Sequence, residues 1–228
     1  MKKGLSIVIN IILFAIVVLL AWQVVKSIQA PIKFSNEQKA REIKVVERLI
    51  DIRNAEVLYK NANNKYTANF DSLIQFCKEA KIPVVKIIPD PTDTTYTRTI
   101  NDTIGYLMVM DSIKGQREEF DINELKYVPF GANHETFEIE AGAIERNGIK
   151  IPVFEARTPY EVYLATPGGG ISDKEWKQRV NNAKAEKEGN AHKDADGNPD
   201  KDDPLYRYPG LKVGSMKEAS TDGNWEKL

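Results

Sequence analysis

The chain has 228 residues and spends about the first 30 on an apolar segment, so the remainder suffices for one domain with a core and a tail, but not for two large domains. Its 32 basic and 33 acidic residues nearly cancel to a formal charge of -1, which argues against a broad electrostatic surface for nucleic acid. The single cysteine, Cys77, excludes an internal disulfide and a cysteine-rich zinc site.

The N-terminal apolar run covers residues 5–25 and contains no charged side chain. As an α-helix it would be about 31 Å long, which matches the hydrocarbon core of a bilayer. A signal peptide has a shorter apolar core of about 7–15 residues before its cleavage site, whereas the only candidate site here, residues 28–30, follows Lys26. We therefore expect an uncleaved transmembrane helix, which is either a plain anchor in the lipid bilayer or a surface through which copies assemble.

The flanking charges and the length of the polar body predict the orientation. Lys2 and Lys3 precede the run while Lys26 and Lys33 follow it, so the bias toward a cytoplasmic N-terminus is modest in count. The short N-terminal stub and the long polar remainder favour the same orientation. The expected topology is a single-pass protein of the inner membrane with an exported C-terminal domain.

A stalk helix is expected after the membrane. Pro31 should interrupt the first helix, and Ser35 with Gln38 has the spacing of a capping box that would restart it. Toward Asn61, apolar residues recur at three- and four-residue steps: Ile43, Val46, Leu49, Ile50, Val57 and Leu58. Charged residues are expected on much of the opposite side: Lys39, Arg41, Lys44, Glu47, Arg48, Asp51, Arg53 and Glu56. This pattern predicts an amphipathic helix with one buried stripe.

A short second helix should follow the stalk. Asn69 or Asp71 can cap it, and it should run to about Ala80. Its buried face would contain Leu73, Ile74, Phe76 and Cys77, so the expected role of Cys77 is that of a packed thiol.

The segment after residue 81 changes to strand-like sequence. Residues 82–88 are rich in β-branched residues, and residues 104–110 are typical of a strand buried on both faces. The pair Asn147-Gly148 predicts a two-residue type I′ hairpin, with Glu145 opposite Lys150 and Ile144 opposite Ile151. Alternating residues Phe137, Ile139, Ala141 and Ala143 should form its apolar face. We therefore expect an α+β fold in which the stalk packs on a small antiparallel sheet.

The C-terminal third is polar before it becomes aromatic again. Pro167–Gly170 should form a hinge, residues 172–188 a short charged helix, and residues 189–203 a flexible segment. The predicted division is a cytoplasmic stub and transmembrane helix (1–30), the stalk and second helix (31–80), an exported β-rich domain (81–166), a polar flexible or partly helical segment (167–203) and a C-terminal segment that docks on the domain (204–228).

Candidate chemistry is sparse. His134 and His192 stand without an HExxH motif, paired carboxylates or a nearby cysteine, so we expect neither catalytic residues nor an organic cofactor. Asp194, Asp196, Asn198 and Asp200 alternate like the first ligands of a calcium loop. However, the glycine is at the fourth position rather than the sixth, and no glutamate stands at the twelfth. The segment is interpreted as a solvated acidic loop, with calcium binding as the alternative.

The helix and the sequence that follows it resemble a known group. A membrane-spanning helix that continues as a stalk, reaches Tyr59 and then reads NANNKYTANFDSL resembles the type IV pilins and type II secretion pseudopilins. The ending TDGNW is similar to the close of the major pseudopilins, which bind calcium in their C-terminal region. Lys2-Lys3-Gly4-Leu5 corresponds to the basic leader, glycine and hydrophobic residue of pilin precursors. The glutamate of the fifth mature position is replaced by Ile9, beside Asn10.

Two functions remain open from the sequence, and both are structural rather than catalytic. The resemblance implies an envelope protein that assembles with copies of itself as a pilin- or pseudopilin-like subunit. The alternative is a single-pass adaptor whose exported domain binds another envelope protein or a ligand.

Overall fold

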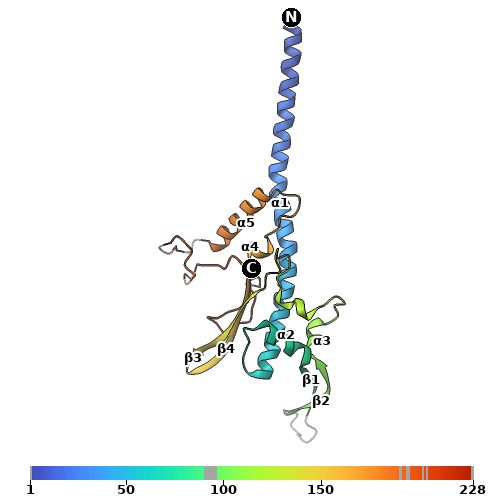
Figure 1. Cartoon of the computed structure of the whole chain (residues 1–228), viewed down its shortest axis with the longest axis vertical. Helices are drawn as coiled ribbons and strands as arrows, with labels where there is room; N and C mark the ends of the chain where they lie inside the picture. The colour runs from blue at the N-terminus through green and yellow to red at the C-terminus, as the bar shows by residue number, and fades with distance from the viewer. Residues whose placement is uncertain are drawn as a thin grey trace.

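The molecule is built on one long helix, α1 (Lys2–Asn63), which is free at its N-terminal end and enclosed by a head at its C-terminal end (Figure 1). The computed structural model describes residues 2–89, 97–189, 192–193, 196–201, 203 and 205–226. With 62 residues, α1 is about 93 Å long at a rise of 1.5 Å per residue.

The predicted interruption at Pro31 is wrong, because α1 continues through this residue. Proline removes one helical hydrogen bond and crowds the preceding turn, so packing has to offset its unfavourable effect. The neighbouring Ala30 and Phe34 are buried, and the Phe34 ring lies edge-on to Trp176 with 5.0 Å between ring centroids. Ser35 therefore lies inside the helix and caps nothing.

The head buries more of α1 than the single predicted stripe. Val45, Leu49, Ile52 and Ala55 are in the core, whereas Ile43, expected to be buried, is exposed. Three residues assigned to the solvent side are buried instead: Arg41, Asp51 and Glu56. The amphipathic interpretation failed here because the head packs around α1 from several directions, so few positions retain a solvent-facing side.

In the described part of the chain, five short helices pack around this spine. They are α2 (Phe70–Glu79), α3 (Val109–Lys114), the 3-10 helix η1 (Ile122–Lys126), α4 (Tyr160–Tyr163) and α5 (Asp173–Glu188). The start of α2 confirms the prediction, since the Asn69 side chain accepts a hydrogen bond of 3.0 Å from the Ser72 N–H. The predicted face is also confirmed: Leu73, Ile74 and Cys77 are buried in the core, and Phe76 packs against it.

Two antiparallel sheets complete the predicted α+β fold. The strands β1 (Lys81–Pro89) and β2 (Thr99–Met108) form a two-stranded sheet. The strands β3 (Glu138–Arg146), β4 (Ile149–Pro159) and β5 (Gly210–Gly214) form a second sheet in the order β3-β4-β5. The C-terminal segment returns to the head as expected, because β5 pairs with β4 and Trp225 packs against the core.

The hairpin between β3 and β4 confirms the prediction residue by residue. Asn147 and Gly148 have φ values of 52° and 77°, and Glu145 faces Lys150 while Ile144 faces Ile151. The predicted apolar face is buried at Phe137 and half-buried at Ile139 and Ala141, but it ends before Ala143, which is exposed near the hairpin tip.

We expect Gly148→Val to lower the free energy of unfolding by about 1 kcal/mol or more, because a β-branched residue is strained at positive φ. Thermal unfolding of the full chain in detergent measures the change. Gly105→Val is the matched control, since Gly105 lies in β2 with ordinary φ and open space beside it, and should be neutral. Equal melting temperatures for the two variants would contradict this description of the turn.

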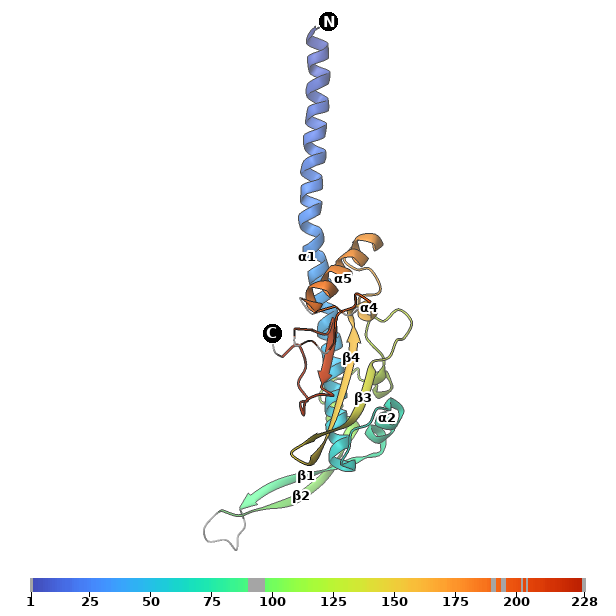
Figure 2. The same ribbon diagram turned by 90° about the vertical axis from the view of Figure 1, so that its left-hand side faces the viewer.

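The predicted doubly buried strand is wrong in both its end and its burial. β2 stops at Met108, and Val109 begins α3. Ile104 and Tyr106 are 64% and 72% exposed. The hairpin of β1 and β2, called the arm below, extends beyond the head at the end opposite the N-terminus (Figure 2). Most of its apolar residues thus meet solvent, although Ile82 at its base packs against the core.

Candidate functional site

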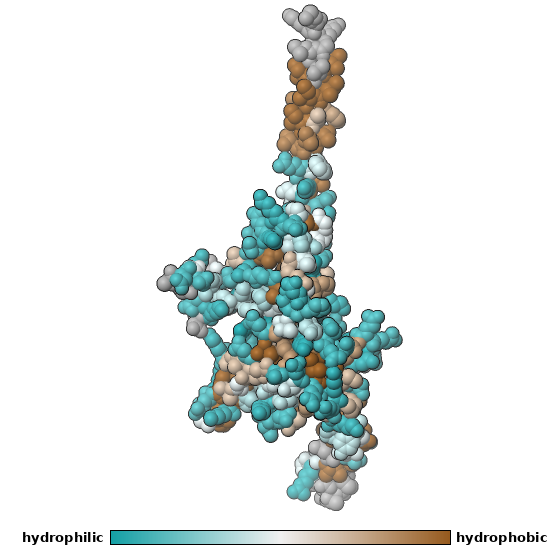
Figure 3. All heavy atoms as spheres, in the orientation of Figure 1, coloured by the Kyte–Doolittle hydropathy of each residue, from teal (hydrophilic) through white to brown (hydrophobic). Residues whose placement is uncertain are grey.

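The first candidate site is the free part of α1. This helix is long and apolar enough to cross a membrane: an 18-residue window has a mean hydropathy of 2.4 and is not buried by the rest of the chain. Large side chains such as Ile12, Phe14 and Leu19 are exposed. Figure 3 shows a mostly brown, apolar band on the part of α1 that projects from the head. A helix that is apolar on all sides requires an apolar environment, either lipid or other helices.

The head begins close to the end of this apolar band. Lys26 is exposed directly after Val25, and Ala30, about 6 Å beyond Lys26 along the helix axis, is already buried. Pro167–Gly170, the predicted hinge, forms a loop beside this part of α1, with Gly169 packed against Lys33. The first buried turn of the head thus lies within one or two helical turns of the apolar band.

A buried arginine fastens the head to α1 at this level. The Arg41 side chain donates hydrogen bonds to the Thr166 and Tyr163 carbonyl oxygens at 2.8 and 3.2 Å. Its Nε pairs with Glu37 at 3.0 Å, and its guanidinium lies over the rings of Trp176 and Phe130. Burial of this charge is tolerated because carbonyls, a carboxylate and two rings surround it.

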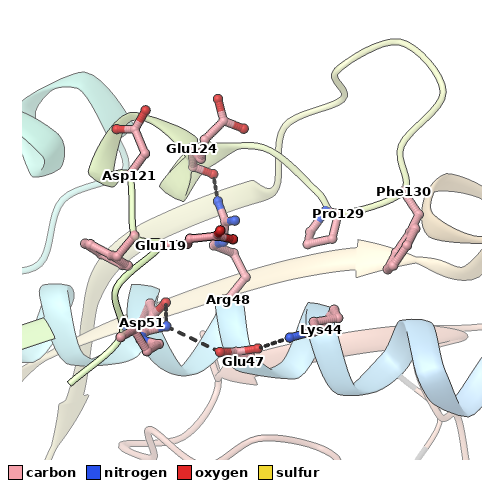
Figure 4. Close-up of a pocket in the computed structure, with 11 residues that line it drawn as sticks. Lys44, Glu47, Arg48, Asp51, Glu119, Asp121, Glu124, Pro129 and Phe130 are labelled. Carbon is pink, nitrogen blue, oxygen red and sulfur yellow. Dashed lines mark hydrogen bonds and ion pairs between the residues drawn. The ribbon is translucent and has the colours of Figure 1, made fainter. Parts of the chain in front are cut away.

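The second candidate site is a charged groove of about 630 Å³ beside α1. Figure 4 shows Lys44, Glu47 and Asp51 along the helix, and the segment carrying Glu124, Pro129 and Phe130 across the groove from them. The remaining lining residues are Arg48, Arg117, Glu119, Phe120 and Asp121. Five carboxylates and three cationic side chains therefore surround the groove.

Two arginines hold the segment after α3 against α1, Arg117 in the loop and Arg48 on α1. Arg117 binds both carboxylate oxygens of Asp51, at 2.8 and 2.9 Å, and this hydrogen bonding raises the pKa of the Arg117 guanidinium. Arg48 donates to the Glu124 carbonyl, and burial lowers its pKa. Lys44 pairs with Glu47 at 3.1 Å. The rim keeps an exposed aromatic ring, because Phe130 is 46% exposed and has a positive φ of 65°.

A third unusual group, the Glu56 carboxyl, lies inside the core. Glu56 is fully buried; its Oε2 accepts a hydrogen bond of 3.1 Å from the Thr67 N–H. Its Oε1 has no hydrogen-bond partner among the residues that the structure describes. Burial raises the pKa of Glu56 to about 8, so the carboxyl is largely protonated at neutral pH. Burial also raises the pKa of Cys77 to about 12, which keeps this thiol neutral and packed, as predicted.

The proposed calcium ligands are only partly within the described chain. Asp194 lies outside it, and Asp196, Asn198 and Asp200 are exposed. Among described residues, no group of three or more histidine, cysteine, aspartate or glutamate side chains is placed to hold a metal ion. The described residues of this segment make other contacts, and His192 Nδ1 lies 2.5 Å from the Asp203 carboxylate. Hydrogen bonds from the backbone N–H groups of His192 and Leu205 and from the His192 ring lower the pKa of Asp203 to about 2.

The sequence contained a signal for the buried charges that the predicted stripe did not use. Val45, Leu49 and Ile52 follow a four- and three-residue spacing, and Arg41 and Glu56 continue it at either end. A buried stripe drawn through these five positions would have placed both Arg41 and Glu56 in the core. The groove had no comparable signal, since its two sides are separated by more than 60 residues in the sequence.

Comparisons with protein-family models, with curated proteins and with solved structures found no match to this chain.

Proposed function

We propose that the chain is a membrane-anchored, non-catalytic envelope subunit that assembles with copies of itself through the apolar part of α1. The observation that carries this proposal is the continuity of one helix between two environments. Its N-terminal part is apolar and uncovered, and its C-terminal part is the spine of the head. Contacts made by the apolar part therefore orient the head directly, without an intervening linker.

The proposed location is the inner membrane, with the N-terminus in the cytoplasm and the head exported. Lys2 and Lys3 before the apolar run, and the short stub they belong to, support this orientation.

The type of subunit that we propose is pilin- or pseudopilin-like. The resemblance of about the first 75 residues to pilins and pseudopilins supports this proposal. The combination of an apolar helix, a helical spine and a small sheet supports it as well. Ile9 stands where pilins place a glutamate, so assembly of this chain would depend on side-chain packing between helices rather than on neutralising a terminal amine.

A cysteine scan of the apolar helix tests this function. In a Cys77→Ser background, single cysteines at positions 6–21 should form crosslinks between copies that recur every three to four residues, because one helix face packs on the neighbour. Replacing residues 5–25 by an unrelated apolar span of equal length, with single cysteines at the same positions, should abolish the pattern. Uniformly absent crosslinks at native expression, with unchanged function after the replacement, would contradict assembly through this helix.

The alternative function is a single-pass adaptor, and the charged groove is the observation that favours it. Its volume of about 630 Å³ and the exposed Phe130 ring at its rim are suited to a segment of another envelope protein. An adaptor needs only apolar length in its anchor, so it would survive the replacement of residues 5–25.

A further inference from the structure

The arm exposes an apolar surface that the described head leaves open. Its large side chains are between 38% and 72% exposed: Val84, Val85, Ile87, Ile100, Ile104, Tyr106 and Leu107. A two-stranded hairpin is marginally stable alone in water. We therefore expect the arm to be covered in the assembled protein.

One face of the arm has no charged side chain along its middle. Side chains on β1 alternate, and each shares its face with its cross-strand partner, so this face contains Pro83, Val85, Ile87, Thr103 and Tyr106. The other face carries Lys86 opposite Asp102. Covering the uncharged face with another apolar surface removes fewer charged groups from water than covering the other face, so it costs less free energy.

The edges of the arm are poor sites for adding a strand. Pro83 and Pro89 remove two N–H donors from β1, and a β-bulge between Val84 and Val85 leaves Ile104 of β2 without a register partner. Prolines and bulges are devices that prevent edge-to-edge pairing. A partner is therefore expected on the face of the arm rather than at its edge.

The position of the arm selects a second copy of this chain as that partner. The arm lies at the end of the molecule opposite the apolar part of α1 (Figures 1 and 2). Copies that cross the same membrane in the same orientation hold their arms at the same height, which raises the effective concentration of one arm for another. An uncharged apolar face can pack on an identical face about a two-fold axis.

We infer that the arms of two copies pack face to face, forming a four-stranded sandwich with the two sheets about 10 Å apart. This inference rests on the proposed self-assembly in a shared membrane. It adds a second contact between copies, far from the contact between their apolar helices.

Crosslinking in proteoliposomes that contain only this protein tests the arm contact. In a full-length Cys77→Ser background, Thr103→Cys or Val85→Cys should give disulfide-linked dimers under mild oxidation, because both positions lie on the uncharged face. Lys150→Cys, at the exposed tip of the β3–β4 hairpin, is the collision control and should give few. Adding Ile87→Lys and Tyr106→Lys, both on the uncharged face, should lower the yield at Thr103→Cys about tenfold, the effect of a tenfold weaker association. Ile149→Lys, a substitution of an exposed isoleucine outside the arm, should leave it unchanged.

Cysteines in the apolar helix, tested in the same vesicles, separate this inference from the proposed function. Helix crosslinks without arm crosslinks would overturn the arm contact alone. Arm crosslinks without helix crosslinks would support the arm contact and count against assembly through α1. An arm yield equal to that of Lys150→Cys, or a yield that persists after the two lysine substitutions, would also overturn the inference.

Discussion

Replacing Glu56 by glutamine is expected to remove most of the dependence of stability on pH between about pH 5 and pH 8. In the folded protein burial raises the pKa of this carboxyl to about 8 from an ordinary value of 4.5. Between these values the folded state binds a proton that the unfolded state releases, so the free energy of unfolding falls as the pH rises and levels off above pH 8. At about 1.4 kcal/mol for each pKa unit, the full loss over this shift is on the order of 5 kcal/mol.

Glutamine preserves the neutral form at every pH. Its side-chain oxygen can still accept the Thr67 N–H, so the variant keeps the one hydrogen bond that Glu56 makes. Melting curves of the full chain in detergent at pH 5, 7 and 9 measure the effect. Glu145→Gln, at an exposed position in β3, should leave the pH profile as it is. Parallel profiles for the natural chain and Glu56→Gln would disprove the raised pKa.

Trp176→Ala should destabilise the head by about 3–5 kcal/mol, the range for truncating a large buried aromatic side chain. Trp176 is 1% exposed, lies edge-on to Phe34, and donates a hydrogen bond of 2.6 Å from Nε1 to the Leu164 carbonyl. Truncation leaves a cavity and an unpaired carbonyl, and it removes one of the two rings that face Arg41. The helix α5, which contains Trp176, should separate from α1 before the rest of the head unfolds.

The melting temperature and limited proteolysis of residues 172–189 report these two effects. Trp22→Ala is the matched control, because Trp22 is exposed on the free part of α1 and makes no contribution to the core. It should leave both the melting temperature of the head and the cleavage pattern unchanged. A loss for Trp176→Ala no larger than that for Trp22→Ala would mean that α5 contributes little to the stability of the head.

Local chemistry made parts of this fold predictable from the sequence. The turn at Asn147-Gly148 and the cap at Asn69 depend on neighbouring residues only, so their backbone requirements are visible in a few letters. The apolar run was equally visible, since membrane length and hydrophobicity are properties of a continuous segment.

The errors arose where distant segments decide the outcome. Pro31 stays helical because Phe34 packs on Trp176, which is 142 residues later in the chain. Glu56 is buried because the segment around Thr67 and the following helix cover it. The reverse error concerns β2. Its apolar residues were assigned to a core, but the head fills its core with residues of α1, the short helices, β4 and β5 and leaves most of the arm outside. No local pattern distinguishes a strand buried by its own chain from one available to another chain.

Because α1 continues through Pro31, a tilt of its N-terminal end is transmitted to the head at its other end. A tilt of about 10° at the N-terminus of a straight 62-residue helix displaces its far end by about 16 Å, given the rise of 1.5 Å per residue. Transmembrane helices tilt to fit the thickness of the surrounding bilayer. Since the head is built directly on this helix, in the proposed assembly a thinner or thicker bilayer would swing the arms of neighbouring copies toward or away from each other, and bilayer thickness would change how often they meet.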